Sequence, residues 1–204
     1  MLQPTMRSPA PDLGPRAVRM IQRILDATNA VLLAKGYGAA TIDDITAEAG
    51  VSRSSFYTYF PTKREALLAL GAEASDYAEA RLEAFAAQHP RRRLEDLRAL
   101  VDAYFDIMDR HGAFLVAWTQ AASEDEEIRL AGMHRHLHTC AMLGRLLAGP
   151  DAAEPAIVGV AAHALLERSW DLGRLYHDRV DLEQLRTQLA SALHEGFVAS
   201  RRPT

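Results

Sequence analysis

The stretch from Thr41 to Phe60 constrains the fold most, because it holds the start and stop signals of two short helices. The Thr41 hydroxyl can accept a hydrogen bond from an orphan backbone N–H, and Asp44 three residues later completes a capping-box pattern. Gly50 can supply the positive φ that ends a helix. Ser52 follows two residues later as a second N-cap. The sequence therefore predicts a helix-turn-helix arrangement.

The second helix of this pair separates apolar from polar side chains. Phe56, Tyr59 and Phe60 have the spacing that packs one side of a helix onto a core, and Tyr57 points away from that side. The remaining faces carry side chains that donate to phosphates and base edges: Arg53, Ser54, Ser55, Tyr57 and Thr58. Aromatic residues at helical spacing are core in almost any small helical domain, so an interaction domain that no longer binds DNA stays open as an alternative.

The run from Thr41 to Lys63 reads T-I-x-x-I-x-x-x-A-G-V-S-x-x-x-F-Y-x-Y-F-x-x-K, and the preceding helix ends in Lys35-Gly-Tyr-Gly38. It resembles the DNA-binding domain of the TetR family of transcriptional regulators over about residues 16–65. The chain departs from the family pattern at Thr46, where such turns usually hold alanine. A threonine there can bond back to its own helix, so we expect a small packing adjustment.

The proline-rich residues 1–15 predict a disordered arm. The resemblance implies a three-helix DNA-binding domain at 16–65 and a helical effector-binding and dimerisation domain at 66–204. About nine helices are expected in all. On the DNA-binding part, we expect base-edge contacts from Arg53, Ser54, Ser55 and Thr58. We expect phosphate contacts from Thr41, Ser52, Tyr57, Tyr59 and Lys63.

Composition independently favours an all-α fold, because helix formers dominate and the Val/Ile/Thr alternation of strands is missing. A single cysteine, Cys140, allows no internal disulfide and favours a reducing cytoplasm. Residues 1–15 hold four prolines and no apolar segment of a signal peptide. No apolar run approaches the roughly 18 residues of a membrane span.

The net charge of −4 is unevenly distributed. Residues 1–65 hold eight Lys/Arg and six Asp/Glu, a net +2, whereas residues 66–204 hold 15 and 21, a net −6. The acidic part would repel DNA, which leaves the amino-terminal part to face it. Affinity should then depend on a few phosphate contacts per subunit.

The remaining helices are expected at about residues 15–35, 62–88, 92–110, 113–122, 124–148, 154–177 and 181–200, and His111-Gly112 is expected to end the helix at 92–110. The last two are apolar beyond one narrow stripe, and in the family such a pair forms a four-helix dimer interface. The expected interface residues are Ile157, Ala161, Leu165, Arg168, Leu185, Leu189 and Leu193. Two-fold symmetry suits a palindromic operator.

An effector pocket follows from the resemblance, and large adaptable side chains on the body helices could line it: Tyr104, Met108, Phe114, Trp118, Met142 and Trp170. The plainer alternative is that they only fill the core. The expected effector is a small apolar or amphipathic molecule. A repressor is the expected mode, and activation stays open because it depends on operator position.

Other functional classes have little support in the sequence. An enzyme would need convergent titratable groups, and neither a nucleophile motif nor a phosphate loop is present. Asp102, Asp106 and Asp109 share a helix face, and His134 and His138 have zinc spacing. Neither set is completed by further ligands, so no metal or cofactor is expected. A DNA architectural protein without an effector is the main alternative.

Overall fold

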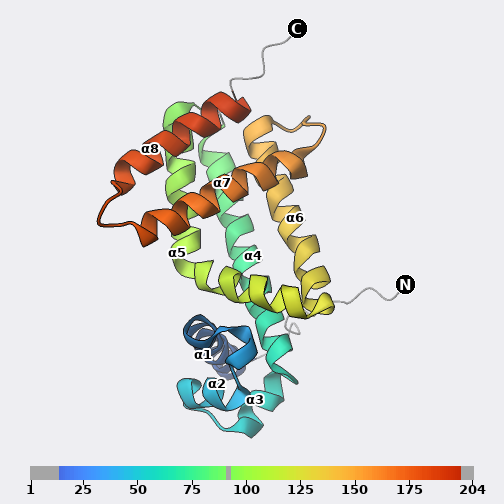
Figure 1. Cartoon of the computed structure of the whole chain (residues 1–204). Helices are drawn as coiled ribbons and strands as arrows, with labels where there is room; N and C mark the ends of the chain where they lie inside the picture. Colours follow the sequence, from blue (N-terminus) through green and yellow to red (C-terminus); the bar gives the residue numbers. More distant parts are fainter. Residues whose placement is uncertain (1–13, 91–92, 199–204) are drawn as a thin grey trace. The chain divides into compact units, whose positions relative to one another are not determined.

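The computed structural model describes residues 14–90 and 93–198, and every regular element among them is helical (Figure 1). The all-α prediction is confirmed. Most of the predicted arm at 1–15, and Arg91 and Arg92, lie outside the described residues. The α-helices are α1 (Pro15–Ala39), α2 (Ile42–Ala49), α3 (Arg53–Tyr59), α4 (Lys63–Gln88), α5 (Leu94–Glu124), α6 (Glu126–Ala148), α7 (Pro155–Leu175) and α8 (Leu182–Leu193), and a π-helical turn, η1, spans His194–Val198.

The described chain divides into two compact units. The first comprises residues 14–75 and 111–134, and the second comprises residues 76–90, 93–110 and 135–198. Helices α4, α5 and α6 therefore each supply residues to both units. None of the described helices is long and apolar enough to cross a membrane.

The first unit has a continuous apolar core built from α1 to α4, the C-terminal part of α5 and the start of α6. Ile24, Phe56, Leu67 and Ile128 are among its fully buried side chains. Thr28 is buried with them, and its hydroxyl donates to the Ile24 carbonyl at 2.7 Å, which satisfies the polar group. The helix-turn-helix is thus part of a larger packed unit.

Close packing at Gly132 fixes α5 against α6 in this unit. A Cβ built on Gly132 would lie 1.7 Å from the Trp118 ring, and one on Gly71 would lie 3.0 Å from the Phe114 ring. Phe114 and Trp118 are themselves in contact, with ring centroids 5.6 Å apart. The two glycines therefore make room for the two aromatic rings between α4, α5 and α6.

In the second unit, α6 and α7 approach through glycines. A Cβ on Gly159 would lie 1.7 Å from the Cys140 carbonyl oxygen, and one on Gly144 would lie 1.7 Å from the Pro155 carbonyl oxygen. Backbone thus meets backbone, which only a residue without a side chain permits. This contact sets the distance between the two helices.

Two predicted helix ends differ from the structure. His111-Gly112 does not end a helix, because α5 runs without interruption from Leu94 to Glu124. Gly112 is buried within it. A glycine inside a helix costs only about 1 kcal/mol relative to alanine, and packing around a buried position offsets such a cost. The α-helix predicted to reach residue 200 ends at Leu193 and continues as the π-helical turn.

Candidate nucleic-acid interface

The turn between α2 and α3 has the geometry that its sequence predicts. The Thr41 hydroxyl accepts from the Asp44 N–H at 3.2 Å, and Asp44 Oδ2 accepts from the Thr41 N–H at 3.0 Å, which completes the capping box. Gly50 is left-handed at φ 60°. Ser52 caps α3 by accepting from the Ser55 N–H at 3.1 Å. All three hydrogen bonds are local, and they satisfy backbone N–H groups at the starts of the two helices.

Buried aromatic side chains anchor α3 to the core. Phe56 has no exposed surface and Phe60 is also buried, while Tyr59 is half-buried. On α2, Thr46 is buried and its hydroxyl donates to the Asp43 carbonyl at 3.1 Å, so it bonds back to its own helix as expected. Phe56, Tyr59 and Phe60 therefore determine which side of α3 packs inward.

The opposite side of α3 is a polar, solvent-exposed surface. Arg53, Ser54, Tyr57 and Thr58 are exposed, with 44 % of Tyr57 accessible, and Ser55 is half-buried. Exposing so much of an aromatic ring has little structural use, whereas a phenol beside an arginine can donate to a phosphate. The exposed side chains here are those expected to contact DNA.

Arg53 is held in position by two neighbours. Its guanidinium pairs with Asp43 of α2 at 2.5 Å and donates to the Tyr57 hydroxyl at 3.2 Å. These two contacts raise the pKa of Arg53, Tyr57 contributing most. The Arg53 and Asp43 side chains are both largely exposed, so their ion pair is weak. Arg53 can therefore leave Asp43 and contact a phosphate or a base instead.

The hydroxyls at the start of α3 bond to one another. Ser52 Oγ lies 2.9 Å from both Ser54 Oγ and Ser55 Oγ, and the Thr58 hydroxyl donates to the Ser54 carbonyl at 2.9 Å. A hydroxyl that donates once still has acceptor lone pairs. These residues therefore retain capacity for a further hydrogen bond to DNA.

Lys63 has a contact that the sequence did not predict. Its ammonium donates to the Tyr37 carbonyl at 2.5 Å and the Ala40 carbonyl at 2.6 Å, and it lies 4.3 Å from the centre of the Tyr37 ring. Burial lowers the pKa of Lys63. A cation at carbonyls that end a helix is favourable. Two of three ammonium hydrogens are thus used within the chain, and one is left for the predicted phosphate contact.

The neighbouring residue of α4 reaches the start of α6 within the same unit. Arg64 pairs with Glu127 and, at 3.6 Å, with Asp125. At the other side of this junction, the Tyr37 N–H donates to Gln120 Oε1 at 3.4 Å. The end of α1, the start of α4 and the α5–α6 corner therefore meet around Lys63 and Arg64.

The predicted pocket residues fall in two groups. Phe114 and Trp118 belong to the first unit, and Tyr104, Met108, Met142 and Trp170 belong to the second. Tyr104, Met108 and Phe114 are buried, while the other three are partly buried. Trp170 donates from its indole N–H to Asp109 at 2.8 Å.

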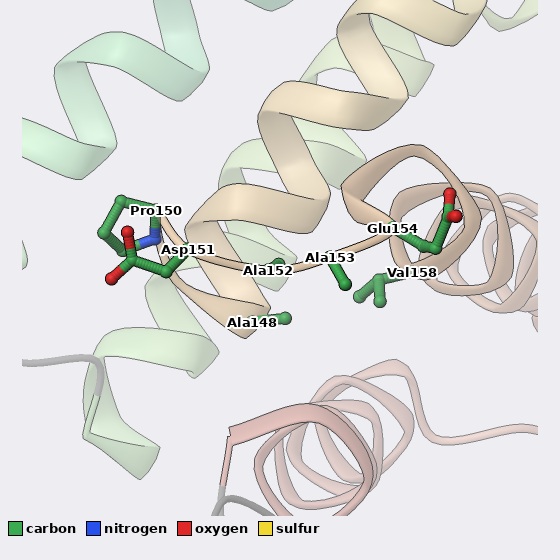
Figure 2. A pocket seen from close by; sticks show the side chains of 7 residues that line it. All are labelled: Ala148, Pro150, Asp151, Ala152, Ala153, Glu154 and Val158. Carbon is green, nitrogen blue, oxygen red and sulfur yellow. The ribbon is translucent and has the colours of Figure 1, made fainter.

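An open hollow of about 430 Å³ lies at the α6–α7 connection, and Figure 2 shows the side chains that line it. They are Ala148, Pro150, Asp151, Ala152, Ala153, Glu154 and Val158. None of the predicted pocket residues is among them. Small apolar groups and two acids form no set of convergent donors, so we assign no ligand to this hollow. Within the described ranges, no group of three or more His, Cys, Asp or Glu is placed to hold a metal ion.

The predicted dimer residues differ in exposure between the last two helices. On α7, Ile157, Ala161, Leu165 and Arg168 are exposed, Ile157 by 65 %. On α8, Leu185 is half-buried, but Leu189 and Leu193 are buried by their own chain. The exposed part of the predicted set is therefore on α7.

Comparison with known proteins gives a family match to the DNA-binding part. Residues 24–70 match the model of bacterial regulatory proteins of the tetR family. The HTH-type transcriptional regulator EthR of Mycolicibacterium smegmatis is 27 % identical over 106 residues, which are 52 % of this chain and 49 % of that protein. The chain thus spans about half the length of this curated relative.

Two solved structures show a shared fold along most of the chain. The fatty acid degradation regulator FadR from Bacillus halodurans has a TM-score of 0.69 and 20 % identity, and the alignment covers 94 % of this chain and 100 % of that one. FadR from Bacillus subtilis, in complex with stearoyl-CoA, has a TM-score of 0.64 and 16 % identity, with 86 % and 98 % covered. The matched family consists of regulators rather than enzymes, as the sequence predicts. Over its residues 24–70, the chain is therefore similar to the tetR family of bacterial regulatory proteins.

Proposed function

We propose that the chain is a homodimeric transcriptional regulator that binds a palindromic operator through α3, acts as a repressor, and is released by a small apolar or amphipathic effector. The observation that carries this proposal is the exposed polar face of α3 beside its buried Phe56. The capped turn holds that face outward, and Arg53, Ser54, Tyr57 and Thr58 supply donors for bases and phosphates.

The first experiment is selection of bound sequences from a random duplex pool with the purified protein. A dimeric reader enriches a palindrome with half-sites about one helical turn, ~34 Å, apart. The enriched site then serves to compare Arg53→Ala with Arg179→Ala. Both remove one positive charge, but Arg179 lies in the α7–α8 connection with its side chain 84 % exposed.

We expect Arg53→Ala to weaken binding and to relax the base preference at one position of each half-site, by about 1–3 kcal/mol if it makes a bidentate base contact. Arg179→Ala should leave the preference unchanged. No enriched sequence at low salt, or equal behaviour of the two variants, would contradict the assignment of α3 as the reading helix.

The exposed apolar face of α7 supports the dimer. Ile157 and Leu165, one side of α7 two turns apart, lie among the exposed apolar side chains of the chain, and apolar surface of this kind favours burial against a partner. Ile157→Arg should shift sedimentation to monomer. The control is Leu33→Arg on α1, because Leu33 is equally exposed at 64 %. If both variants remain dimeric, α7 is not the interface.

The effector is the least constrained part of the proposal. Stearoyl-CoA, the molecule bound to the Bacillus subtilis neighbour, is a suitable first probe because it is amphipathic. If it or a shorter acyl-CoA is an effector, its addition should raise the melting temperature and release the selected DNA. A shared fold does not imply a shared ligand, so the same screen should include a wider set of apolar compounds.

A DNA-binding protein without an effector is the second candidate, and the packing of the predicted pocket residues favours it. Tyr104, Met108 and Phe114 are buried, and they do not line the described hollow. This candidate predicts that no compound in the screen alters DNA binding, whereas the regulator predicts at least one.

A further inference from the structure

Five titratable side chains from three helices gather in the second unit. Tyr104 comes from α5, His136 and Cys140 come from α6, and His163 and Glu167 come from α7. They form a connected chain of contacts rather than separate pairs. Burial, followed by the charge of Glu167, raises the pKa of both Tyr104 and Cys140, and the His163 contact lowers the pKa of Glu167.

His163 is the centre of this chain. Its Nδ1 lies 2.6 Å from the Tyr104 hydroxyl, and its Nε2 lies 3.3 Å from Glu167 Oε2. A carboxylate accepts only, so the neutral ring carries its hydrogen on Nε2 and donates it to Glu167. Nδ1 is then the acceptor for the Tyr104 O–H, and all three groups are satisfied.

Protonation of His163 breaks this pattern. Both ring nitrogens then donate, so the Tyr104 oxygen must accept and its own hydrogen loses its partner. Tyr104 is buried, and burial raises its pKa, so the hydroxyl cannot respond by ionising at ordinary pH. A buried donor without an acceptor bears its full desolvation cost.

A second imidazole adds to the effect. The rings of His136 and His163 lie 4.6 Å apart, and His136 Nε2 lies 3.5 Å from the Cys140 sulfur. His136 is exposed by residue surface area, yet partial desolvation, followed by the neighbouring His163, lowers its pKa. Glu167, whose pKa the His163 contact lowers, is one carboxylate for two imidazoles. It compensates one added proton but not two.

We propose that Tyr104, His136, His163 and Glu167 form an acid-sensitive latch that holds α7 against α5 and α6. At neutral pH the latch is closed because every donor has an acceptor. When acid protonates the two imidazoles, the Tyr104 hydroxyl loses its acceptor, the two rings repel each other, and α7 loosens.

The single cysteine of the chain, Cys140, reports on the latch. It lies buried beneath His136, and burial raises its pKa to about 11, so it reacts slowly when the latch is closed. The experiment measures its reaction rate with 4,4′-dithiodipyridine, which also reacts with thiols at acid pH, from pH 7.5 to 5.5. Dividing the rate of the guanidinium-unfolded protein by that of the native protein at each pH gives a protection factor.

We expect the wild-type protection factor to fall by about tenfold or more on acidification, the scale expected when a buried donor loses its partner. His163→Gln offers an acceptor to Tyr104 and a donor to Glu167 without titrating, so its protection should stay within about twofold. Tyr104→Phe removes the hydroxyl instead and should reduce the acid-induced fall. His134→Asn, an exposed histidine of the same helix, should behave as the wild type.

A wild-type protection factor that stays constant with pH would overturn the latch. A fall in both His163→Gln and Tyr104→Phe that is as large as the fall of the wild type would also overturn it, because the loss would then come from general acid unfolding. If His163→Gln does not fold, Tyr104→Phe alone decides between these outcomes.

α7 also carries the exposed apolar face assigned to the dimer, and this last step rests on the proposed function. If α7 is the interface, acidification should weaken dimerisation of the wild type but not of His163→Gln in sedimentation. Cysteine protection that falls without any change in sedimentation would support the latch and remove its link to the dimer.

Discussion

Substitution of Lys63 by methionine separates two roles of this residue. The change keeps the length of the side chain but removes the ammonium, which lies 2.5 Å from the Tyr37 carbonyl and 2.6 Å from the Ala40 carbonyl. Charge-assisted hydrogen bonds contribute about 1.5–3 kcal/mol each when shielded, and Lys63 is only partly buried, so we discount the sum to about 2–4 kcal/mol. Lys63→Met should therefore destabilise the first unit by that amount.

Thermal unfolding measures this loss. For a chain of this size, 1 kcal/mol corresponds to roughly 2–4 °C, so the melting temperature should fall by roughly 4–16 °C. Fluorescence anisotropy with the selected operator gives the second quantity, the slope of log affinity against log salt concentration. A phosphate contact in each subunit would reduce that slope by ~1.8 for a dimer. A structural cation leaves the slope unchanged.

Lys35→Met is the matched control, since Lys35 and Lys63 are the two lysines of the chain. The Lys35 side chain is about half exposed and forms a surface ion pair with Asp44 at 2.7 Å, which contributes only ~0–1 kcal/mol. The reasoning is refuted if Lys63→Met and Lys35→Met have the same melting temperature and only the slope of log affinity against log salt concentration decreases in Lys63→Met. That result would make Lys63 a phosphate contact and nothing more.

Two further predictions concern stability. Gly159→Ala should destabilise the second unit by at least about 2 kcal/mol, because its Cβ would lie 1.7 Å from the Cys140 carbonyl oxygen. Gly196→Ala is the control, because a Cβ there would meet nothing within 4 Å. Its melting temperature should equal or slightly exceed that of the wild type. The Lys35 contact and the Thr41 hydrogen bonds lower the pKa of Asp44 to about 2, so Asp44 stabilises the fold above its unfolded value near 3.8, and that contribution is lost as the pH falls toward 2. Asp44→Asn should therefore flatten the decline of melting temperature between pH 4 and 2, and an unchanged decline would contradict this assignment.

The helix-turn-helix could be predicted because its determinants are local. Thr41 with Asp44 and Ser52 with Ser55 are each three residues apart, and Gly50 acts through its own φ. Interactions of this kind are fully encoded by residue type and spacing. The burial of Phe56 and the exposure of Tyr57 could be predicted in the same way, because adjacent residues of a helix point to different faces.

Contacts between residues far apart in the chain could not be predicted from the sequence. Lys63 reaches Tyr37 and Ala40 across more than twenty residues, so its spacing within the motif suggested only a phosphate contact. The same holds for Tyr104 and His163, which are 59 residues apart. For each of these contacts, the sequence showed only that a polar side chain lies on an otherwise apolar face.

Periodicity also does not show what an apolar face packs against. α7 and α8 both carry wide apolar stripes, yet Ile157 and Leu165 are exposed while Leu189 and Leu193 are covered by their own chain. A leucine that meets its own core and one that meets a partner give the same pattern. The helix break predicted at Gly112 failed for a related reason, because burial overrode the local stop signal.

Two adjacent residues at the start of α4, Lys63 and Arg64, contact other helices of the first unit with unequal strength. Lys63 fixes the end of α1 through two carbonyls and a ring, whereas Arg64 reaches Glu127 of α6, which is largely exposed. A surface ion pair contributes ~0–1 kcal/mol, so the Arg64 contact breaks before the Lys63 contact does. Under the proposed function, a displacement at the start of α6 would therefore release Arg64 first and leave α1, α2 and α3 together as one body. Moving the start of α6 would also disturb the packing of Ile128 in the shared core, so an effector would need a differential affinity for the two states that covers both costs.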